Sequence, residues 1–264
     1  DRAGNLVKTV PPEGVQTNLP NRLTPENHNY RTAYEYNSLG QLITQETPDG
    51  GKTNFINNSI GQLRFSQNAK QAVANVYSYT KYDELGRIVE VGESNIVSSF
   101  AALSSSADVT YPITIAAMFP NSPSNNQRTN TVYSDAAVGI SYFGQEQRHL
   151  QNRVSWVYND YGVKTYFSYD PHGNVEWLIH DIPGLGKNYM RYEYDLISNK
   201  VKKVIYNEFR QDRFYHRYFY DEENKVTKVE TSSDDVICEA DAKYKYNRLK
   251  QLLRTEIGKD KVQC

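Results

Sequence analysis

The sequence predicts an all-β fold of stacked antiparallel β-hairpin repeats, interrupted by one irregular, part-helical insertion. Tyrosine makes up 22 of the 264 residues, against nine phenylalanines and two tryptophans, and aromatic side chains favour the pleated, half-buried surface of a sheet. A mean hydropathy of −0.72 fits a sheet whose faces are partly wetted. A turn signal that recurs about every 25 residues indicates a repeat architecture.

The repeat is clearest in YSYTKYDELGRIVEVGE, residues 77–93. Its plan is aromatic-x-aromatic, then Asp or Asn, a short gap, Gly, a polar residue and a strand of alternating apolar residues. The two alternating segments predict the strands of a hairpin, and the polar segment between them predicts its turn. The other copies, in chain order, are residues 34–46, 53–67, 166–181, 192–207, 218–230 and 244–256.

Glycine or asparagine occupies the same turn position in most copies, because these residues accept a positive φ at the lowest steric cost. Lys250 occupies it in the last copy, so either that turn has a different geometry or the alignment is wrong there. Gly4 looks like the turn of a further copy whose first strand has been cut away. The predicted structural turn residues are Gly40, Gly61, Gly86, Gly173, Asn199 and Asn224.

Paired aromatic residues precede the turns, and we expect them to pack across strands within the sheet. An isolated hairpin is only marginally stable in water, so the repeats must share one sheet with their neighbours. We therefore expect flanking repeats of a longer parent protein, with the chain truncated at both ends. The predicted repeat aromatics are Tyr34, Tyr36, Tyr77, Tyr79, Tyr166, Tyr169, Tyr192, Tyr194, Tyr218 and Tyr220.

Residues 94–150 interrupt the repeats, and they divide the chain into hairpins at 1–93, an irregular insertion at 94–150 and hairpins at 151–264. The insertion is rich in Ser, Ala and Asn and contains prolines at positions 112, 120 and 123, which predicts an irregular loop with one short helix. Either it is a partner-binding or lid element carried on the scaffold, or it is a tolerated loop excursion, and we favour the second interpretation.

Charge and hydropathy patterns exclude two classes of partner. Thirty basic and 31 acidic residues are interspersed, with no basic block of the kind that follows phosphates, so nucleic acid is not expected. No apolar run reaches the roughly 18 residues that cross a bilayer, and the first residues lack a signal pattern, so we expect no membrane insertion. Cys238 and Cys264 are expected to be ordinary thiols, since two cysteines make no disulfide framework.

No catalytic, cofactor or metal site is predicted. The histidines are scattered and none has the spacing of a metal-ligand pair. No glycine-rich loop has the context of a phosphate-binding site. Aspartates before the turns suit caps that accept hydrogen bonds from nearby backbone amides, rather than catalytic carboxylates. We therefore expect no enzyme, and the capping residues are Asp83, Asp170, Asp195 and Asp221.

The pattern from Tyr79 to Ile88, repeated from Tyr169 to Val175, resembles the RHS or YD-repeat family. This family includes bacterial polymorphic toxins, the B and C components of insecticidal toxin complexes, and the teneurins. Residues 152–178 are also similar to large secreted RHS proteins of Bacteroidetes-type bacteria. The resemblance implies a sheet that spirals into a hollow shell, and a secreted or cell-surface location. DIPGLG at 181–186 only faintly resembles the family's self-cleavage motif, and we interpret it as a hairpin connection.

In bacterial members of the family, the shell encloses a C-terminal toxic domain until delivery. The resemblance therefore implies a structural segment of a β-shell that encapsulates and helps to deliver a toxin or effector domain. The implied partners are flanking repeats, the enclosed domain and secretion machinery. The alternative is a cell-surface adhesin or recognition module that binds a glycan or a protein, as in teneurin-like usage.

Overall fold

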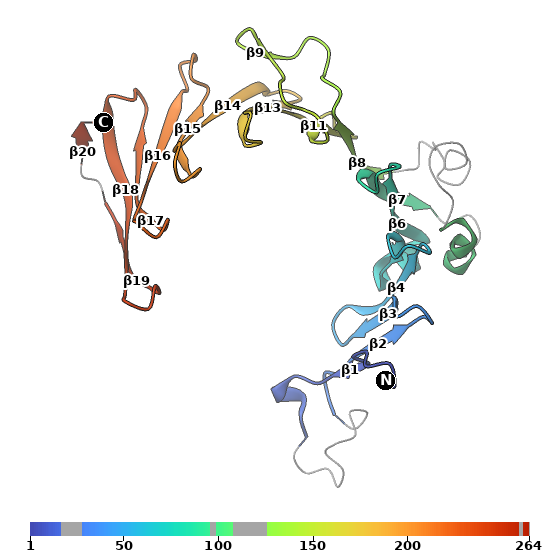
Figure 1. The fold of residues 1–264 in the computed structure, drawn as a ribbon. Helices are drawn as coiled ribbons and strands as arrows, with labels where there is room; N and C mark the ends of the chain where they lie inside the picture. The colour runs from blue at the N-terminus through green and yellow to red at the C-terminus, as the bar shows by residue number, and fades with distance from the viewer. Residues whose placement is uncertain (17–27, 96–98, 108–125, 259–260, 264) are drawn as a thin grey trace. The chain divides into compact units, whose positions relative to one another are not determined.

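The computed structural model describes residues 1–16, 28–95, 99–107, 126–258 and 261–263 (Figure 1). The chain divides into two compact units, Asp1–Asn130 and Thr131–Cys264. In each unit nearly every strand pairs antiparallel with the next strand of the chain, so both units are stacks of hairpins. The predicted all-β fold of stacked antiparallel hairpins is confirmed.

The first unit is built on one sheet whose strands follow chain order. A short helix, α1 (Ala69–Ala74), connects two of its strands and begins at Asn68, whose side chain forms a capping box with Gln71. The other helical turns are η1 (Pro12–Gly14) and η3 (Phe100–Ser106). The strands are β1 (Lys8–Thr9), β2 (Thr32–Tyr36), β3 (Leu42–Thr47), β4 (Gly51–Asn57), β5 (Leu63–Gln67), β6 (Val76–Tyr82), β7 (Ile88–Asn95) and β8 (Asn126–Tyr133).

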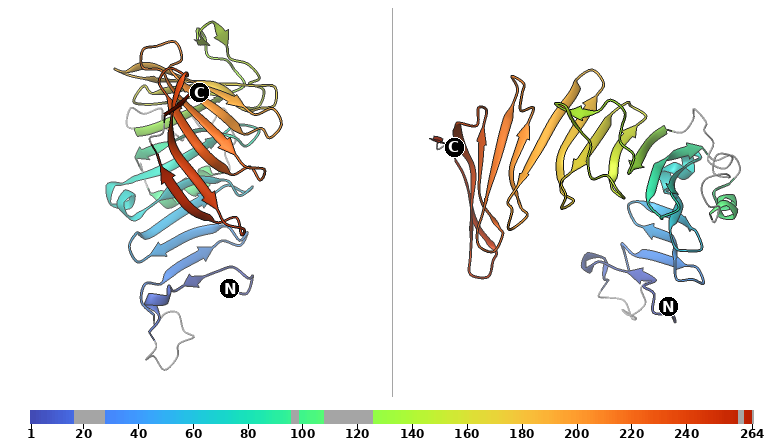
Figure 2. Two further views of the ribbon diagram at one scale, coloured as in Figure 1. Left: turned by 90° about the vertical axis from the view of Figure 1, so that its left-hand side faces the viewer. Right: turned by 45° about the horizontal axis from the view of Figure 1, so that its top comes forward.

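The second unit continues the same plan, and Figure 2 shows its later strands, coloured orange to red, running side by side. Residues 131–133 of β8 also belong to this unit. A separate small hairpin consists of β9 (Ser141–Tyr142) and β10 (Gln145–Glu146). The sheet strands are β11 (Val154–Asn159), β12 (Lys164–Tyr169), β13 (Val175–Ile182), β14 (Gly186–Tyr194), β15 (Val201–Tyr206), β16 (Phe214–Tyr220), β17 (Val226–Ser232), β18 (Ile237–Tyr246), β19 (Leu252–Ile257) and β20 (Lys261–Gln263).

The repeat turns share one hydrogen-bond plan, although the turn from Asp195 to Lys200 is one residue longer than the others. In the Asp83–Arg87 turn, the Asp83 amide donates to the Arg87 carbonyl and the Gly86 amide donates to the Asp83 carbonyl, at 2.9 and 3.0 Å. The residue before the last takes a positive φ, and the strand register then shifts by one residue, as in hairpins with a glycine bulge. The φ values are +73° at Gly40, +87° at Gly61, +76° at Gly86, +94° at Gly173, +56° at Asn199 and +64° at Asn224.

Lys250 does not break the pattern. Its φ is +66°, and its amide donates to the Asn247 carbonyl at 2.9 Å, as the equivalent residue does in the other turns. Both expected explanations, a different turn geometry and a misalignment, are therefore wrong. Gly4 has φ +86° and donates to the Asp1 carbonyl at 3.2 Å, which is the turn geometry expected for it.

The range predicted as an irregular insertion, 94–150, contains regular structure. The helical turn η3 supplies the helix, and β8 pairs with β7 as part of the sheet, while residues 108–125 lie outside the described part of the chain. After β8, the Ser134 amide donates to the Arg153 carbonyl at 3.1 Å, and Asn152 takes φ +57°. These are the ends of a repeat turn in which a long loop replaces the middle residues, and this copy was not recognised in the sequence.

Each unit has a buried aromatic cluster on its sheet. Phe65, Tyr77 and Tyr79 form the cluster of the first unit, and Phe100 and Leu103 of η3 pack against it. Tyr142, Tyr166, Trp177 and Ile179 form that of the second unit.

The prediction of ordinary thiols is wrong for Cys238. It is fully buried on β18 and disulfide-bonded, whereas Cys264 lies outside the described residues.

Lys250→Gly is expected to increase the free energy of unfolding by about 1 kcal/mol, because a side chain in the left-handed region costs about that much and glycine avoids the cost. The measurement is the urea midpoint at an unchanged slope. Lys250→Ala is the matched control, since it removes the ammonium group that contacts Glu223 at 2.9 Å but keeps the strained conformation. Equal midpoints for the glycine and alanine variants would contradict the explanation.

Candidate functional site

The turn aspartates act as caps for the backbone. One carboxylate oxygen of Asp83 accepts hydrogen bonds from the amides of Leu85 and Arg87, at 3.0 and 2.9 Å, and the other binds the Arg87 guanidinium at 2.7 Å. Partial burial alone would raise the pKa of Asp83, but the hydrogen bonds from Arg87 and its charge hold that pKa below its usual value. Asn37, Asn159, Asp221 and Asn247 cap their turns through the same two amides.

A ladder of tyrosine hydroxyls joins each hairpin to the one before it. The tyrosine directly before a turn donates its hydroxyl to a carbonyl of the preceding copy, two residues after that copy's left-handed turn residue. The bonds of this tyrosine ladder run from Tyr36 to Leu6 (2.9 Å), Tyr82 to Leu63 (2.9 Å), Tyr169 to Val154 (2.8 Å), Tyr194 to Val175 (2.8 Å), Tyr220 to Val201 (2.7 Å) and Tyr246 to Val226 (2.9 Å).

Asparagine replaces tyrosine in one copy without ending the ladder. The side-chain amide of Asn57 donates to the Leu42 carbonyl at 3.1 Å, which is the equivalent acceptor. Where the hydroxyl is buried, its charged form is disfavoured. Burial, together with the nearby Tyr192 and Asp170, raises the pKa of Tyr194 to about 12, so this hydroxyl remains a donor at neutral pH.

The predicted repeat aromatics occupy three different places. Tyr36, Tyr169, Tyr194 and Tyr220 belong to the tyrosine ladder. Tyr34, Tyr192 and Tyr218 lie two residues earlier and are half-buried. Tyr77, Tyr79 and Tyr166 are buried in the aromatic clusters instead. The sequence alignment missed Tyr82 and Tyr246, although each directly precedes the capping Asp or Asn of its turn.

The long loop between Ser134 and Arg153 crosses one face of the second unit, and we call residues 135–152 the strap (Figure 1). Gln147 fixes one half of the strap, because its side-chain nitrogen Nε2 donates to the Ser155 and Phe167 carbonyls at 2.8 and 2.7 Å. The Arg148 amide donates to the Ser168 hydroxyl at 2.9 Å. Tyr142 of the strap stacks on Trp177, with ring centroids 5.8 Å apart, so the strap covers the buried cluster.

Acidic residues bind two further connecting loops to cations on the sheet. Glu208, after β15, contacts Arg191 at 2.7 and 2.9 Å and accepts a hydrogen bond from the Tyr142 hydroxyl at 3.2 Å. Asp235, between β17 and β18, contacts Arg217 at 2.9 Å and also binds Lys203. Partial burial would raise the pKa of Asp235, but these two cations hold it below its usual value.

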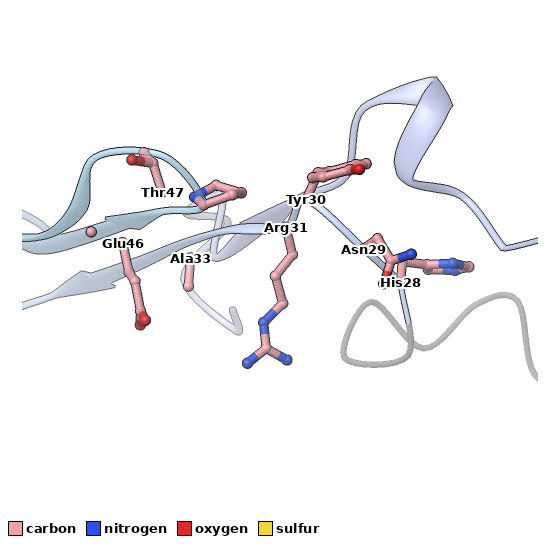
Figure 3. Close-up of a pocket in the computed structure, with 9 residues that line it drawn as sticks. His28, Asn29, Tyr30, Arg31, Ala33, Glu46 and Thr47 are labelled. Atoms are coloured by element: carbon pink, nitrogen blue, oxygen red, sulfur yellow. The ribbon is translucent and has the colours of Figure 1, made fainter.

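A pocket of about 410 Å³ lies where β2 begins and β3 ends, and the residues that line it include His28, Arg31, Glu46 and Thr47 (Figure 3). His28 Nδ1 accepts a hydrogen bond from the Gln16 amide at 3.0 Å. Figure 3 shows Arg31 and Glu46 extending to one side of the strands and Thr47 to the other, so its polar groups do not converge. Among the described residues that line this pocket, no acid, base and nucleophile come together.

The other histidines are dispersed. His149 is in the strap, His172 is in a turn, and His180 and His216 are on β13 and β16. Across the described ranges, no three His, Cys, Asp or Glu residues lie close enough together to hold a metal ion. Among the same residues, no helix combines the length and apolar character needed to cross a membrane.

Tyr220→Phe is expected to lower the free energy of unfolding by about 1 kcal/mol, because the Val201 carbonyl loses its donor while the ring still packs. Tyr161→Phe is the matched control, since that residue is 69% exposed and has no bond in the ladder. Both are compared with the unchanged chain by urea denaturation. Equal stability of the two variants would contradict the role of the Tyr220 hydroxyl in joining one hairpin to the hairpin before it.

Comparison with known proteins identifies distant similarities. No protein-family model matches the chain. It is 32% identical over 100 residues to salivary gland surface protein 1 of Aedes aegypti, which covers 35% of this chain and 3% of that protein. The chain therefore spans a small fraction of that relative's length. Similar solved structures include the TcdB2–TccC3 complex, at 12% identity, with 86% of this chain and 14% of that chain covered and a TM-score of 0.36. A porin-like protein from Bacteroides uniformis has 8% identity, with 88% and 90% covered and a TM-score of 0.28.

Proposed function

We propose that this chain is a wall segment of an RHS-type β-shell, which encapsulates and helps to deliver a C-terminal toxin or effector domain. The tyrosine ladder is the observation that carries this proposal. Each of its bonds joins one hairpin to the preceding hairpin at an equivalent pair of atoms. Repeats joined in this way extend a sheet at a constant interval, which is what a wall requires.

The side chains of the sheet support a structural role without catalysis. The aspartates that could serve as general acids or bases are engaged by turn amides, as in Asp83 and Asp221. Several charged side chains of the second unit form ion pairs with one another, as Arg191 does with Glu208. The proposed partners are flanking repeats of the same parent protein, the enclosed domain and secretion machinery, and the proposed location is outside the cell or on its surface.

The second candidate is a surface recognition module. The Aedes aegypti relative is named a surface protein, which favours this alternative. The rings of Phe143 and Phe209 lie 4.6 Å apart, and both are partly exposed, so they offer an apolar contact for a glycan or a protein. The two candidates differ downstream, where a shell is followed by a self-cleavage motif and a toxic domain and an adhesin by an anchor.

The proposal is tested on the full-length parent protein by limited proteolysis. The domain that follows the repeats is expected to resist protease in the unchanged protein and to lose that protection in Gly86→Val. A β-branched residue at φ +76° is strained by about 1–3 kcal/mol, and its Cβ would lie 3.0 Å from the Gln62 side chain. The wall should therefore fail locally.

Two control variants separate wall failure from other effects. Gly86→Asn is expected to keep the protection, since asparagine occupies the same position at Asn199 and Asn224. His180→Ala is also expected to keep it, and toxicity with it. A downstream domain that is digested as rapidly in the unchanged protein as in Gly86→Val would refute encapsulation, and a folded histidine variant without toxicity would refute the absence of catalysis.

A further inference from the structure

The two halves of the strap are held by different sets of contacts. Near its end, Gln147 and the Arg148 backbone amide bind β11 and β12 through neutral hydrogen bonds, and the Arg148 guanidinium pairs with Glu176 of β13 at 2.9 Å. Its tip is the tight turn of the β9–β10 hairpin, where Phe143 takes φ +46° and Gly144 takes φ +91°. The tip makes its polar contact with the sheet side through the Tyr142 hydroxyl and Glu208. Gly139, with φ +72° and no neighbour within 4 Å of an added Cβ, precedes the tip and allows it to turn.

The tip covers an apolar surface that has no polar anchor of its own. Trp177 is fully buried, and its indole nitrogen has no hydrogen-bond partner among the described residues. Its neighbour Ile179 is also buried, with 1% exposure. Tyr142 lies over the indole, and Phe143 contacts Tyr189 with ring centroids 4.8 Å apart. Removing the tip would therefore expose Trp177, which is fully buried beneath it.

We propose that the strap tip is a latch, which Glu208 holds shut through Tyr142 and Arg191 and which opens when Glu208 loses its charge. Glu208 is the shared partner in this arrangement, because it accepts from the strap and from the sheet at the same time. Without the carboxylate charge, Arg191 keeps its contact with Glu193 at 3.0 Å, but the link between the sheet and the strap is weakened. Opening uncovers Trp177 while Gln147 still holds the strap to the sheet.

The surroundings of Glu208 determine the pH at which the latch opens. Arg191 of β14, which also pairs with Glu193, faces it, together with Lys203 from β15, Tyr215 from β16 and Tyr142 from the strap. The hydrogen bond from Arg191 and then its charge hold the pKa of Glu208 below its usual value, against the effect of partial burial. A lowered folded-state pKa stabilises the closed state above the unfolded value of about 4.3, and that stabilisation is lost as the pH falls from there through the lowered folded-state pKa. The latch therefore stays shut at pH 5 to 7 and opens in acid, at a pH below about 4.3.

The two tryptophans make the latch measurable. Trp156 and Trp177 are the only tryptophans of the sequence, so Trp156→Phe leaves Trp177 as the single reporter. In this background, acrylamide quenching of Trp177 fluorescence is expected to be weak and constant from pH 7 to 5 and to rise severalfold below about pH 4. Glu208→Gln is expected to raise the quenching severalfold at pH 7 and to abolish the acid transition.

Glu193→Gln is the matched control, because it removes the other carboxylate on Arg191 without touching the strap. It is expected to keep weak quenching at pH 7, and far-UV circular dichroism shows that each variant retains its sheet. If Glu208→Gln fails to fold, Tyr142→Phe replaces it, since it keeps the ring and removes only the hydroxyl that binds Glu208. The latch proposal would be overturned if folded Glu208→Gln or Tyr142→Phe protein showed the same quenching profile as the Trp156→Phe background.

Discussion

The structure depends above all on the hydrogen bond from a tyrosine hydroxyl to a backbone carbonyl just after the turn of the preceding copy. A hairpin of two strands buries too little surface to persist alone, so each copy needs its neighbour. Main-chain ladders join the strands without fixing which repeat follows which, whereas the hydroxyl fixes the register at an equivalent point in successive copies. Phenylalanine would supply the ring but not this bond, which explains why tyrosine occupies the position before the turn in these copies.

The remaining features follow from the fixed conformation of the repeat turns. The capped turns leave the backbone little conformational freedom, and the longer connections between strands differ more from one another. The loops containing Glu208 and Asp235 both fold back onto the face that carries Arg191, Lys203 and Arg217. The sheet thus gains a covered face without a second layer of strands. Charged side chains are used there because each loop needs a specific partner, which apolar packing alone does not supply.

The sequence predicts what depends on a few adjacent residues. Turn chemistry and strand alternation located the hairpins, since a capping Asp or Asn and a left-handed residue lie within one turn. The alignment assigned Tyr77 and Tyr79 to the position that Tyr82 holds, because three tyrosines in one strand satisfy the same pattern on opposite faces. The copy whose turn begins at Ser134 was missed because the strap separates the two ends of that turn. The contact of Tyr142 with Glu208 joins residues 66 positions apart, which no local pattern records.

The tyrosine ladder also has a direction that matters while the protein is being made. Each hydroxyl belongs to a later copy than the carbonyl it binds, as Tyr194 does relative to Val175 and Tyr220 relative to Val201. On the ribosome, the acceptor therefore emerges first and waits in a hairpin that is already formed. Every new hairpin meets a finished template and never has to hold a place for one not yet synthesised. Each bond of the ladder can therefore form as soon as the later copy has been synthesised.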